Sequence, residues 1–197
     1  EADCLYSGIV IDTNNFTTKT GVRTFEAAAF LRRNGADVTR VKKMFREDVV
    51  SYMIKAETVR NTQIFDDKFA IGICPSEGVD SPTIIGAQAA NDLLEIKGIE
   101  ASFVLTEYND KIYISARSID RINVQLIMEK LGGGGHMNMA GTQLENIMIE
   151  DAVELVKARL RAVHLLEAHE VLRIIDGVCP QVVRPQDVAD HAVSRVV

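Results

Sequence analysis

Residues Gly132–Gly135, followed by His136, form the segment of this sequence that most directly suggests chemistry. Consecutive residues without a Cβ let the backbone approach a ligand closely and point several N–H groups at it. His136 adds a titratable ring at the end of the run. These groups suit an anionic, phosphate-bearing ligand. The structural alternative is a flexible connection between a helix and a strand.

The stretch before this run, residues 111–118, alternates between apolar and polar side chains and therefore predicts a strand. The residues expected to face the core are Ile112, Ile114 and Ala116. Arg117 lies on the other face and carries a planar, permanently charged fork that suits bidentate phosphate contact, although it could instead form a surface ion pair. Ser115 and Ser118 could donate to a phosphate or simply close the strand.

Near the start of the chain, an apolar stretch from Leu5 leads to Asp12, Thr13 and Phe16. We expect this stretch to be a strand that delivers Asp12 at its C-terminal edge, where ligands collect in open α/β sheets. An Asp-Thr pair can equally cap a helix or form a turn.

The remaining pattern alternates helices with strands and predicts an α/β fold. Helices are expected over 22–34, after a cap at Asp37, over 49–62, after the Ser81-Pro82 cap, over 124–131 and over 150–163. Strands are expected over 68–74, 100–108, 111–116 and 142–149. Asn109-Asp110 predicts a hairpin turn, and residues Val124, Ile127, Met128 and Leu131 mark the inward face of their helix.

Composition narrows the possible functions. Of 197 residues, 47% are hydrophobic and 25% charged, which is typical of a globular chain, and no apolar run is long enough to span a membrane. The net charge of −6 argues against a long track for DNA or RNA but allows a local pocket for a small nucleotide. The three cysteines, Cys4, Cys74 and Cys179, are far apart and indicate reduced thiols rather than a zinc site.

The Ser-Ala-Arg-Ser strand end, the short helix and the Gly-Gly-Gly-Gly-His run together resemble the substrate-binding domain of DHH-family phosphoesterases. The pattern Gly8-x-x-x-Asp12-Thr13-x-x-Phe16 is similar to the last metal-binding motif of the Asp-His-His (DHH) catalytic domain. This resemblance implies a partial DHH domain over 1–60, joined to a mixed-sheet α/β DHH-associated domain over 66–163, with a cleft between them. Residues 164–197 form an unassigned extension with scattered histidines.

The resemblance also implies roles for residues. Asp12 would be one ligand of a dinuclear site, usually manganese, whose other ligands are expected to precede Glu1, so we expect the chain to be a fragment that is inactive alone. The residues implied in substrate binding are Gly132, Gly133, Gly134, Gly135, His136, Arg117, Ser115 and Ser118.

The amino-acid sequence of these motifs is most similar to that of the C-terminal region of membrane-anchored bacterial cyclic-di-AMP phosphodiesterases. The resemblance implies that the chain is a cytoplasmic enzyme region of a membrane-anchored parent protein, which hydrolyses cyclic di-AMP to pApA. It also implies that the enzyme acts on small nucleotides rather than on long nucleic acids, and that the intact protein forms a homodimer. The alternatives are a nanoRNase or pAp-phosphatase of the same family and a catalytically inactive nucleotide-binding module.

Overall fold

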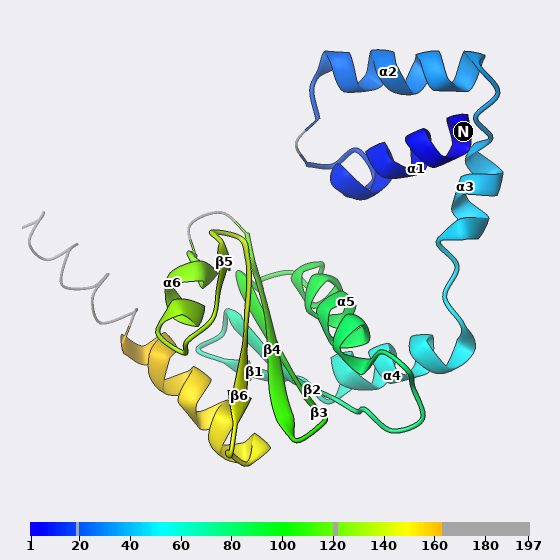
Figure 1. Cartoon of the computed structure of the whole chain (residues 1–197). Helices are drawn as coiled ribbons and strands as arrows, with labels where there is room; N and C mark the ends of the chain where they lie inside the picture. The colour runs from blue at the N-terminus through cyan, green and yellow to red at the C-terminus, as the bar shows by residue number, and fades with distance from the viewer. Residues whose placement is uncertain (19, 120–121, 163–197) are drawn as a thin grey trace, which may run out of the picture. The chain divides into compact units, whose positions relative to one another are not determined.

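The computed structural model describes residues 1–18, 20–119 and 122–162. The chain divides into two compact units, Glu1–Tyr52 and Met53–Val197, which Figure 1 shows with their helices and strands. The predicted α/β class is confirmed. The predicted extension at 164–197, with Cys179 and its histidines, lies outside the described residues.

The first unit is helical, with α1 (Ala2–Asp12), α2 (Val22–Arg33) and α3 (Val38–Met44), and α4 (Val49–Arg60) follows. The predicted cap at Asp37 is confirmed, because its carboxylate accepts from the backbone N–H groups of Thr39 and Arg40.

The predicted strand at Asp12 is wrong, because residues Ala2–Asp12 form helix α1. A short continuous apolar run has no periodicity that distinguishes a strand from a buried helix. The hydroxyl of Thr13 donates to the Ile9 carbonyl at 2.6 Å, a bond to the preceding helical turn, and the positive φ angles of Asn14 and Asn15 then end the helix. Asp12 is therefore exposed at the C-terminal end of a helix and not at the edge of a sheet.

The second unit is built on a six-stranded sheet of order β1-β2-β3-β4-β6-β5. Its strands are β1 (Gln63–Phe65), β2 (Phe69–Cys74), β3 (Ala101–Tyr108), β4 (Lys111–Ser118), β5 (Gly134–His136) and β6 (Met139–Glu145). The β2–β3 pair is parallel and connected through α5 (Pro82–Leu94), whereas the other pairs are antiparallel. The mixed sheet expected for this region is therefore present.

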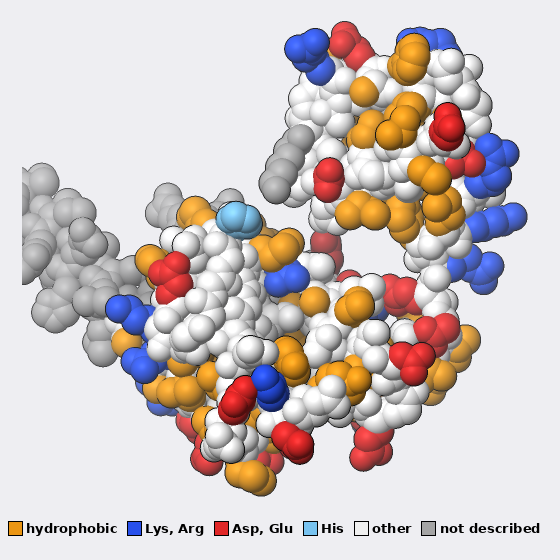
Figure 2. Space-filling model, in the orientation of Figure 1, with side chains coloured by type: hydrophobic (Ala, Val, Ile, Leu, Met, Phe, Trp, Pro, Cys, Tyr) orange, Lys and Arg blue, Asp and Glu red, His pale blue; other side chains and the backbone are white. Residues whose placement is uncertain are grey.

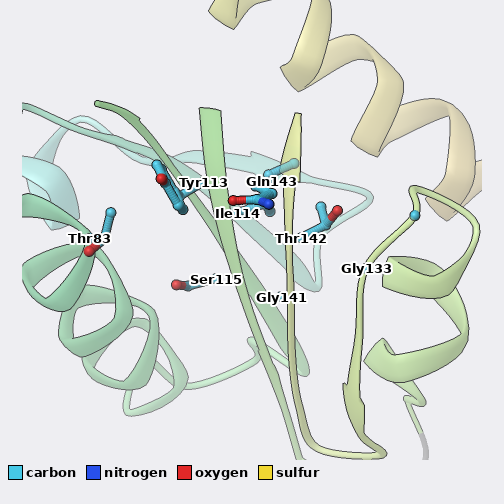
Figure 3. A pocket seen from close by; sticks show the side chains of 9 residues that line it. Thr83, Tyr113, Ile114, Ser115, Gly133, Gly141, Thr142 and Gln143 are labelled. Atoms are coloured by element: carbon cyan, nitrogen blue, oxygen red, sulfur yellow. The ribbon is translucent and has the colours of Figure 1, made fainter. Parts of the chain in front are cut away.

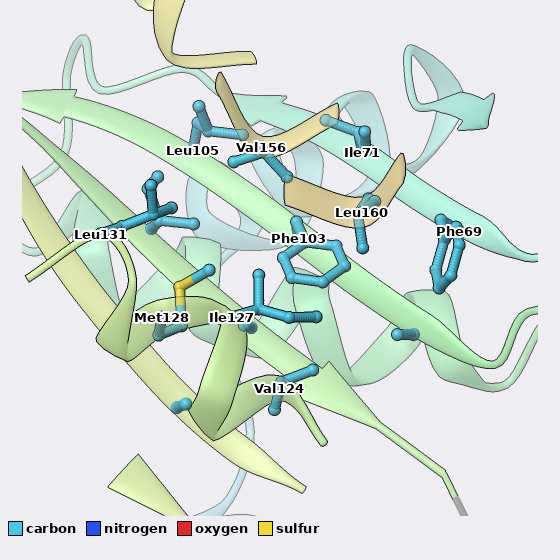
Figure 4. Packing of buried hydrophobic residues seen from close by; sticks show 14 of the residues in the cluster. Phe69, Ile71, Phe103, Leu105, Val124, Ile127, Met128, Leu131, Val156 and Leu160 are labelled. Carbon is cyan, nitrogen blue, oxygen red and sulfur yellow. The ribbon is translucent and has the colours of Figure 1, made fainter. Parts of the chain in front are cut away.

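Helices cover both faces of the sheet (Figure 1). Helix α5 packs on one face, where Ala89 and Leu93 meet Val104 of β3. Helix α6 (Val124–Glu129) and the helix over 149–162 pack on the other face around Phe103 (Figure 4). The predicted inward face of α6 is confirmed, because Val124, Ile127, Met128 and Leu131 are all buried.

The hairpin predicted at Asn109-Asp110 is confirmed, with φ angles of 51° and 58° that suit a tight turn between twisted strands. Strand β1 was not predicted, because three residues are too few to show alternation. Strand β6 begins at Met139 rather than at the predicted residue 142. Within the described residues, no helix is both long and apolar enough to cross a membrane.

Candidate functional site

Strand pairing aligns the predicted residues of β4 and β5 in one row, with β6 between them. Arg117 on β4 pairs with Met139 on β6, and Met139 pairs with His136 on β5. Paired residues in a sheet point to the same face, so Arg117 and His136 lie in one row that we call the charged row. The next row on that face, about 7 Å along the strands, contains Ser115, Gly141 and Gly134, and we call it the small row.

Arg117 is a cation held by neutral groups. Its Nε donates to Oδ1 of Asn91 on α5 at 2.9 Å, and one terminal nitrogen donates to the Ala116 carbonyl, also at 2.9 Å. Partial burial lowers the pKa of the guanidinium, which still stays protonated at neutral pH. Within the described part of the chain, no carboxylate pairs with Arg117, so its charge is available to an anion.

The glycine run is not the loop that the sequence suggested. The Gly132 and Gly133 amides donate to the Glu129 and Met128 carbonyls and end helix α6, so these two amides do not point at a ligand. Gly134 and Gly135 then begin β5, which pairs with β6. The run is therefore partly a helix cap and partly an edge strand.

Close backbone packing explains two of these glycines. A Cβ at Gly133 would overlap the Gly141 carbonyl oxygen, and one at Gly135 would overlap the backbone of Ala140. Gly134 is different, because a Cβ there would meet no atom within 4 Å. The fold does not require glycine at this position, which belongs to the small row and borders His136.

His136 is exposed at the end of β5, and it is the pale blue side chain in Figure 2. Ser118, in contrast, points to the opposite face from Arg117 and is 6% exposed. Its hydroxyl donates to the Ile122 carbonyl at 2.6 Å, and Nδ2 of Asn138 donates to the Ser118 carbonyl at 3.3 Å. Ser118 therefore supports the turn that follows His136, and we do not include it among the groups that face a ligand.

A hollow of about 440 Å³ lies on the face of the sheet that bears the small row (Figure 3). Its lining residues are Thr83, Tyr113, Ile114, Ser115, Gly132, Gly133, Gly141, Thr142 and Gln143. Sequence analysis missed Thr83, Tyr113 and Gln143 as site residues. The alternation of β4 places Tyr113 beside Ser115, but the contributions of α5 and β6 depend on tertiary packing and on strand register.

Asp12 belongs to the first unit, and the expected cleft between it and His136 stays a prediction. Among the described residues, no group of three or more His, Cys, Asp or Glu side chains is placed to hold a metal ion. The residues described here therefore do not by themselves fit a dinuclear metal site.

Residues 67–162 match the DHHA1 domain. The second unit thus contains a member of the DHHA1 domain family, and the resemblance to the C-terminal part of DHH-family phosphoesterases is confirmed.

The curated relatives of this chain include cyclic-di-AMP phosphodiesterases. The chain is 48% identical over 153 residues to cyclic-di-AMP phosphodiesterase PdeA of Listeria monocytogenes, covering 77% of this chain and 23% of that protein. It is 42% identical over 159 residues to cyclic-di-AMP phosphodiesterase GdpP of Bacillus subtilis, covering 80% of this chain and 24% of that protein. The chain thus spans about a quarter of the length of these relatives.

The fold is also found in a solved structure, that of an exopolyphosphatase-related protein from Bacteroides fragilis. The two share 22% sequence identity with a TM-score of 0.75, and the match covers 84% of this chain and 51% of that one.

Proposed function

We propose that this chain is the nucleotide-binding part of a longer phosphodiesterase that hydrolyses cyclic di-AMP to pApA. The charged row carries the proposal, because it places on one face of the sheet an exposed histidine and an arginine that has no carboxylate partner among the described residues. The identity of 42–48% to cyclic-di-AMP phosphodiesterases supports this choice of substrate.

The residues of the charged row have distinct roles in this proposal. Arg117 binds two phosphate oxygens with its terminal nitrogens, while Asn91 fixes the orientation of the fork through Nε. His136 donates a ring N–H to the same phosphate or to its neighbour. Gly134 and Ser115 leave room for the phosphate to approach the sheet, and the Ser115 hydroxyl can donate to it.

We also propose that Asp12 is a metal ligand in the longer protein, where manganese ions would lower the pKa of a water and neutralise charge on the phosphoryl oxygens. A carboxylate at the C-terminal end of a helix opposes the helix dipole, so the fold gives no stabilising reason for Asp12. A lone carboxylate does not hold a hard divalent ion against water. We therefore expect the 197-residue chain to bind manganese weakly and to lack turnover.

Homodimer formation and membrane attachment of the longer protein rest on the resemblance alone and stay predictions.

Calorimetry with linear pApA in the presence of EDTA tests the binding role. We expect the chain to bind pApA and Arg117→Ala to weaken binding by about tenfold or more, the effect of losing a charge-assisted pair. Arg23→Ala, which removes an exposed arginine of α2, is the matched control and should bind normally. Equal affinity of the Arg117→Ala and unsubstituted chains would contradict the proposal.

The second candidate, a nucleotide-binding module without activity, is favoured by one observation, the lack of a metal-binding group of side chains among the described residues. Measuring cleavage of cyclic di-AMP distinguishes the phosphodiesterase from the inactive binding module. A longer protein that includes the upstream region should cleave cyclic di-AMP with manganese, whereas the module should bind pApA and cleave nothing. Preference for a short diadenylate over cyclic di-AMP would instead indicate a nanoRNase.

A further inference from the structure

The hollow is lined in part by the small row and lies between charged side chains at the two ends of β4. On the face that bears Arg117, β4 and β6 form successive rows: Lys111 with Glu145, Tyr113 with Gln143, Ser115 with Gly141, and Arg117 with Met139. Lys111 and Glu145 form an ion pair of 2.7 Å at one end. The hollow lies over the two middle rows, and Figure 3 shows Tyr113 and Gln143 on adjacent strands, with Thr83 on α5 beside them.

The lining of the hollow is uncharged. Its side chains offer hydroxyl groups, one aromatic ring and one primary amide, and the rest of the wall is glycine backbone and an aliphatic residue. Two cations of β4 flank the hollow: Lys111 is already neutralised by Glu145, and Arg117 belongs to the charged row. Such a site favours a neutral, planar, hydrogen-bonding group over a second phosphate. Its volume of about 440 Å³ lies within the range of small-molecule sites.

Tyr113 and Gln143 have the chemistry that recognises a nucleobase. Tyr113 is a half-buried ring on which a base can stack. The Gln143 amide has a donor and an acceptor, which match the N6 amino group and N7 of adenine. Neither side chain has a hydrogen-bond partner within the described part of the chain, so both polar ends are available.

The spacing of the rows fits a dinucleotide. Tyr113 precedes Arg117 by four residues, which is about 13 Å along a strand. The small row between them leaves the face open for the sugar and backbone of a ligand that reaches from one row to the other. On α5, Thr83 and Asn91 are eight residues apart and so lie on one side of the helix, beside the hollow and beside Arg117 respectively.

We infer that the hollow is a base subsite in which Tyr113 stacks on the base and Gln143 selects adenine over guanine. The inference rests on the proposed function, because it takes the charged row as the phosphate site.

The test compares binding of pApA and pGpG to the full chain by calorimetry in EDTA. Gln143→Glu removes the amide donor that pairs with adenine and supplies a carboxylate that accepts from N1–H and the N2 amino group of guanine. We expect the ratio of pApA to pGpG affinity to fall by about tenfold or more. The ratio also cancels any general repulsion between the new carboxylate and the phosphates.

Two further variants separate stacking from hydrogen bonding. Tyr113→Leu should weaken both dinucleotides by about tenfold without changing their ratio, and Tyr113→Phe should stay within about twofold of the unsubstituted chain. The matched control is Gln63→Glu on the opposite edge strand, where the new carboxylate meets Lys157 and should leave the ratio unchanged. Thermal unfolding of each variant confirms that it is folded.

The outcomes distinguish the base subsite from the phosphate site. If Arg117→Ala weakens both dinucleotides but Gln143→Glu leaves their ratio unchanged, the base subsite is wrong and the proposed function stands. If the unsubstituted chain binds pGpG as tightly as pApA, adenine selection by Gln143 is also wrong. If it binds neither dinucleotide, both proposals are overturned.

Discussion

Arg117 of β4 and Asn91 of α5 are joined by a hydrogen bond of 2.9 Å from Nε to Oδ1. The bond ties the strand that carries the site to the helix that covers the same face. Because Asn91 is neutral, it orients the guanidinium without neutralising it. An aspartate at position 91 would form an ion pair with Arg117 and compete with any anionic ligand.

We expect Asn91→Ala and Asn91→Asp to weaken pApA binding to different extents. Asn91→Ala frees the guanidinium to reorient and should cost a few-fold in affinity, since one exposed hydrogen bond contributes about 1 kcal/mol. Asn91→Asp should cost more, because the ligand must displace a carboxylate. Calorimetry at two salt concentrations checks this order, with Asn61→Ala, a change in an exposed residue after α4, as the control. Tighter binding by Asn91→Asp would contradict the role of Asn91.

His136→Ala should reduce pApA binding while the midpoint of thermal unfolding stays within a few degrees, because the side chain is exposed and surface changes alter stability by about 0.5 kcal/mol or less. His136→Gln keeps a side-chain N–H donor and should recover part of the affinity. Calorimetry and thermal unfolding of both variants test this expectation. A large loss of stability with unchanged binding would show that His136 supports the fold instead.

Site residues that lie on a single strand could be predicted from the pattern of that strand. Site residues that are brought in by the packing or pairing of several elements could not. Strict alternation placed Ser115 and Arg117 on one face of β4, and that placement is confirmed. The same alternation places Ser118 on the opposite face, which was overlooked. Gln143 joins the site through the β4–β6 register, which no local pattern encodes.

The first unit shows a different reason for failure. The run from Leu5 to Asp12 is apolar with β-branched residues, a pattern that favours a strand, yet it packs as a helix against α2 and α3. Tertiary packing overrides such weak local preferences. The glycine run predicts a ligand-binding loop because ordering glycines costs conformational entropy. In the structure, a helix cap and close packing on β6 offset part of that cost, so a ligand alone does not account for the run.

Asp12→Asn should abolish cleavage of cyclic di-AMP in a longer protein that contains the upstream region, if Asp12 holds manganese there. The amide keeps the shape of the side chain but removes the charge that a hard cation needs. Glu77→Gln, a matched change at an exposed carboxylate, should leave turnover intact. Turnover by the 197-residue chain alone, at a rate comparable to that of the longer protein, would show the dinuclear assignment to be wrong.

Asp3 should make the first unit sensitive to acid. Its carboxylate accepts from Arg40 Nε at 2.7 Å and from the Asp37 N–H at 2.7 Å, and the Arg40 bond is the main reason that the pKa of Asp3 is lowered. Because the folded pKa lies below the unfolded one, this stabilisation is complete above the unfolded pKa and is lost as the pH falls through the folded value. The side-chain carboxyl carbon of Asp3 in NMR spectra should therefore titrate below the ordinary value of 3.8. Asp3→Asn should remove that titration, whereas a midpoint above 3.8 would exclude the bond in solution.

The adjacent glycines Gly133 and Gly134 offer the sharpest separation of fold from function. Gly133→Ala drives a Cβ into the Gly141 carbonyl and should cost about 1–3 kcal/mol, which lowers the unfolding midpoint of a domain of this size by about 5 °C or more. Gly134→Ala meets open space and should leave the midpoint unchanged or slightly higher, because alanine loses less backbone entropy on folding. Its methyl group enters the small row, so pApA binding should weaken about tenfold even though the domain is fully folded. Calorimetry and thermal unfolding of the two variants measure both effects. If Gly134→Ala binds pApA normally, the ligand does not approach the sheet at the small row, and the phosphate must be held by Arg117 and His136 from further out.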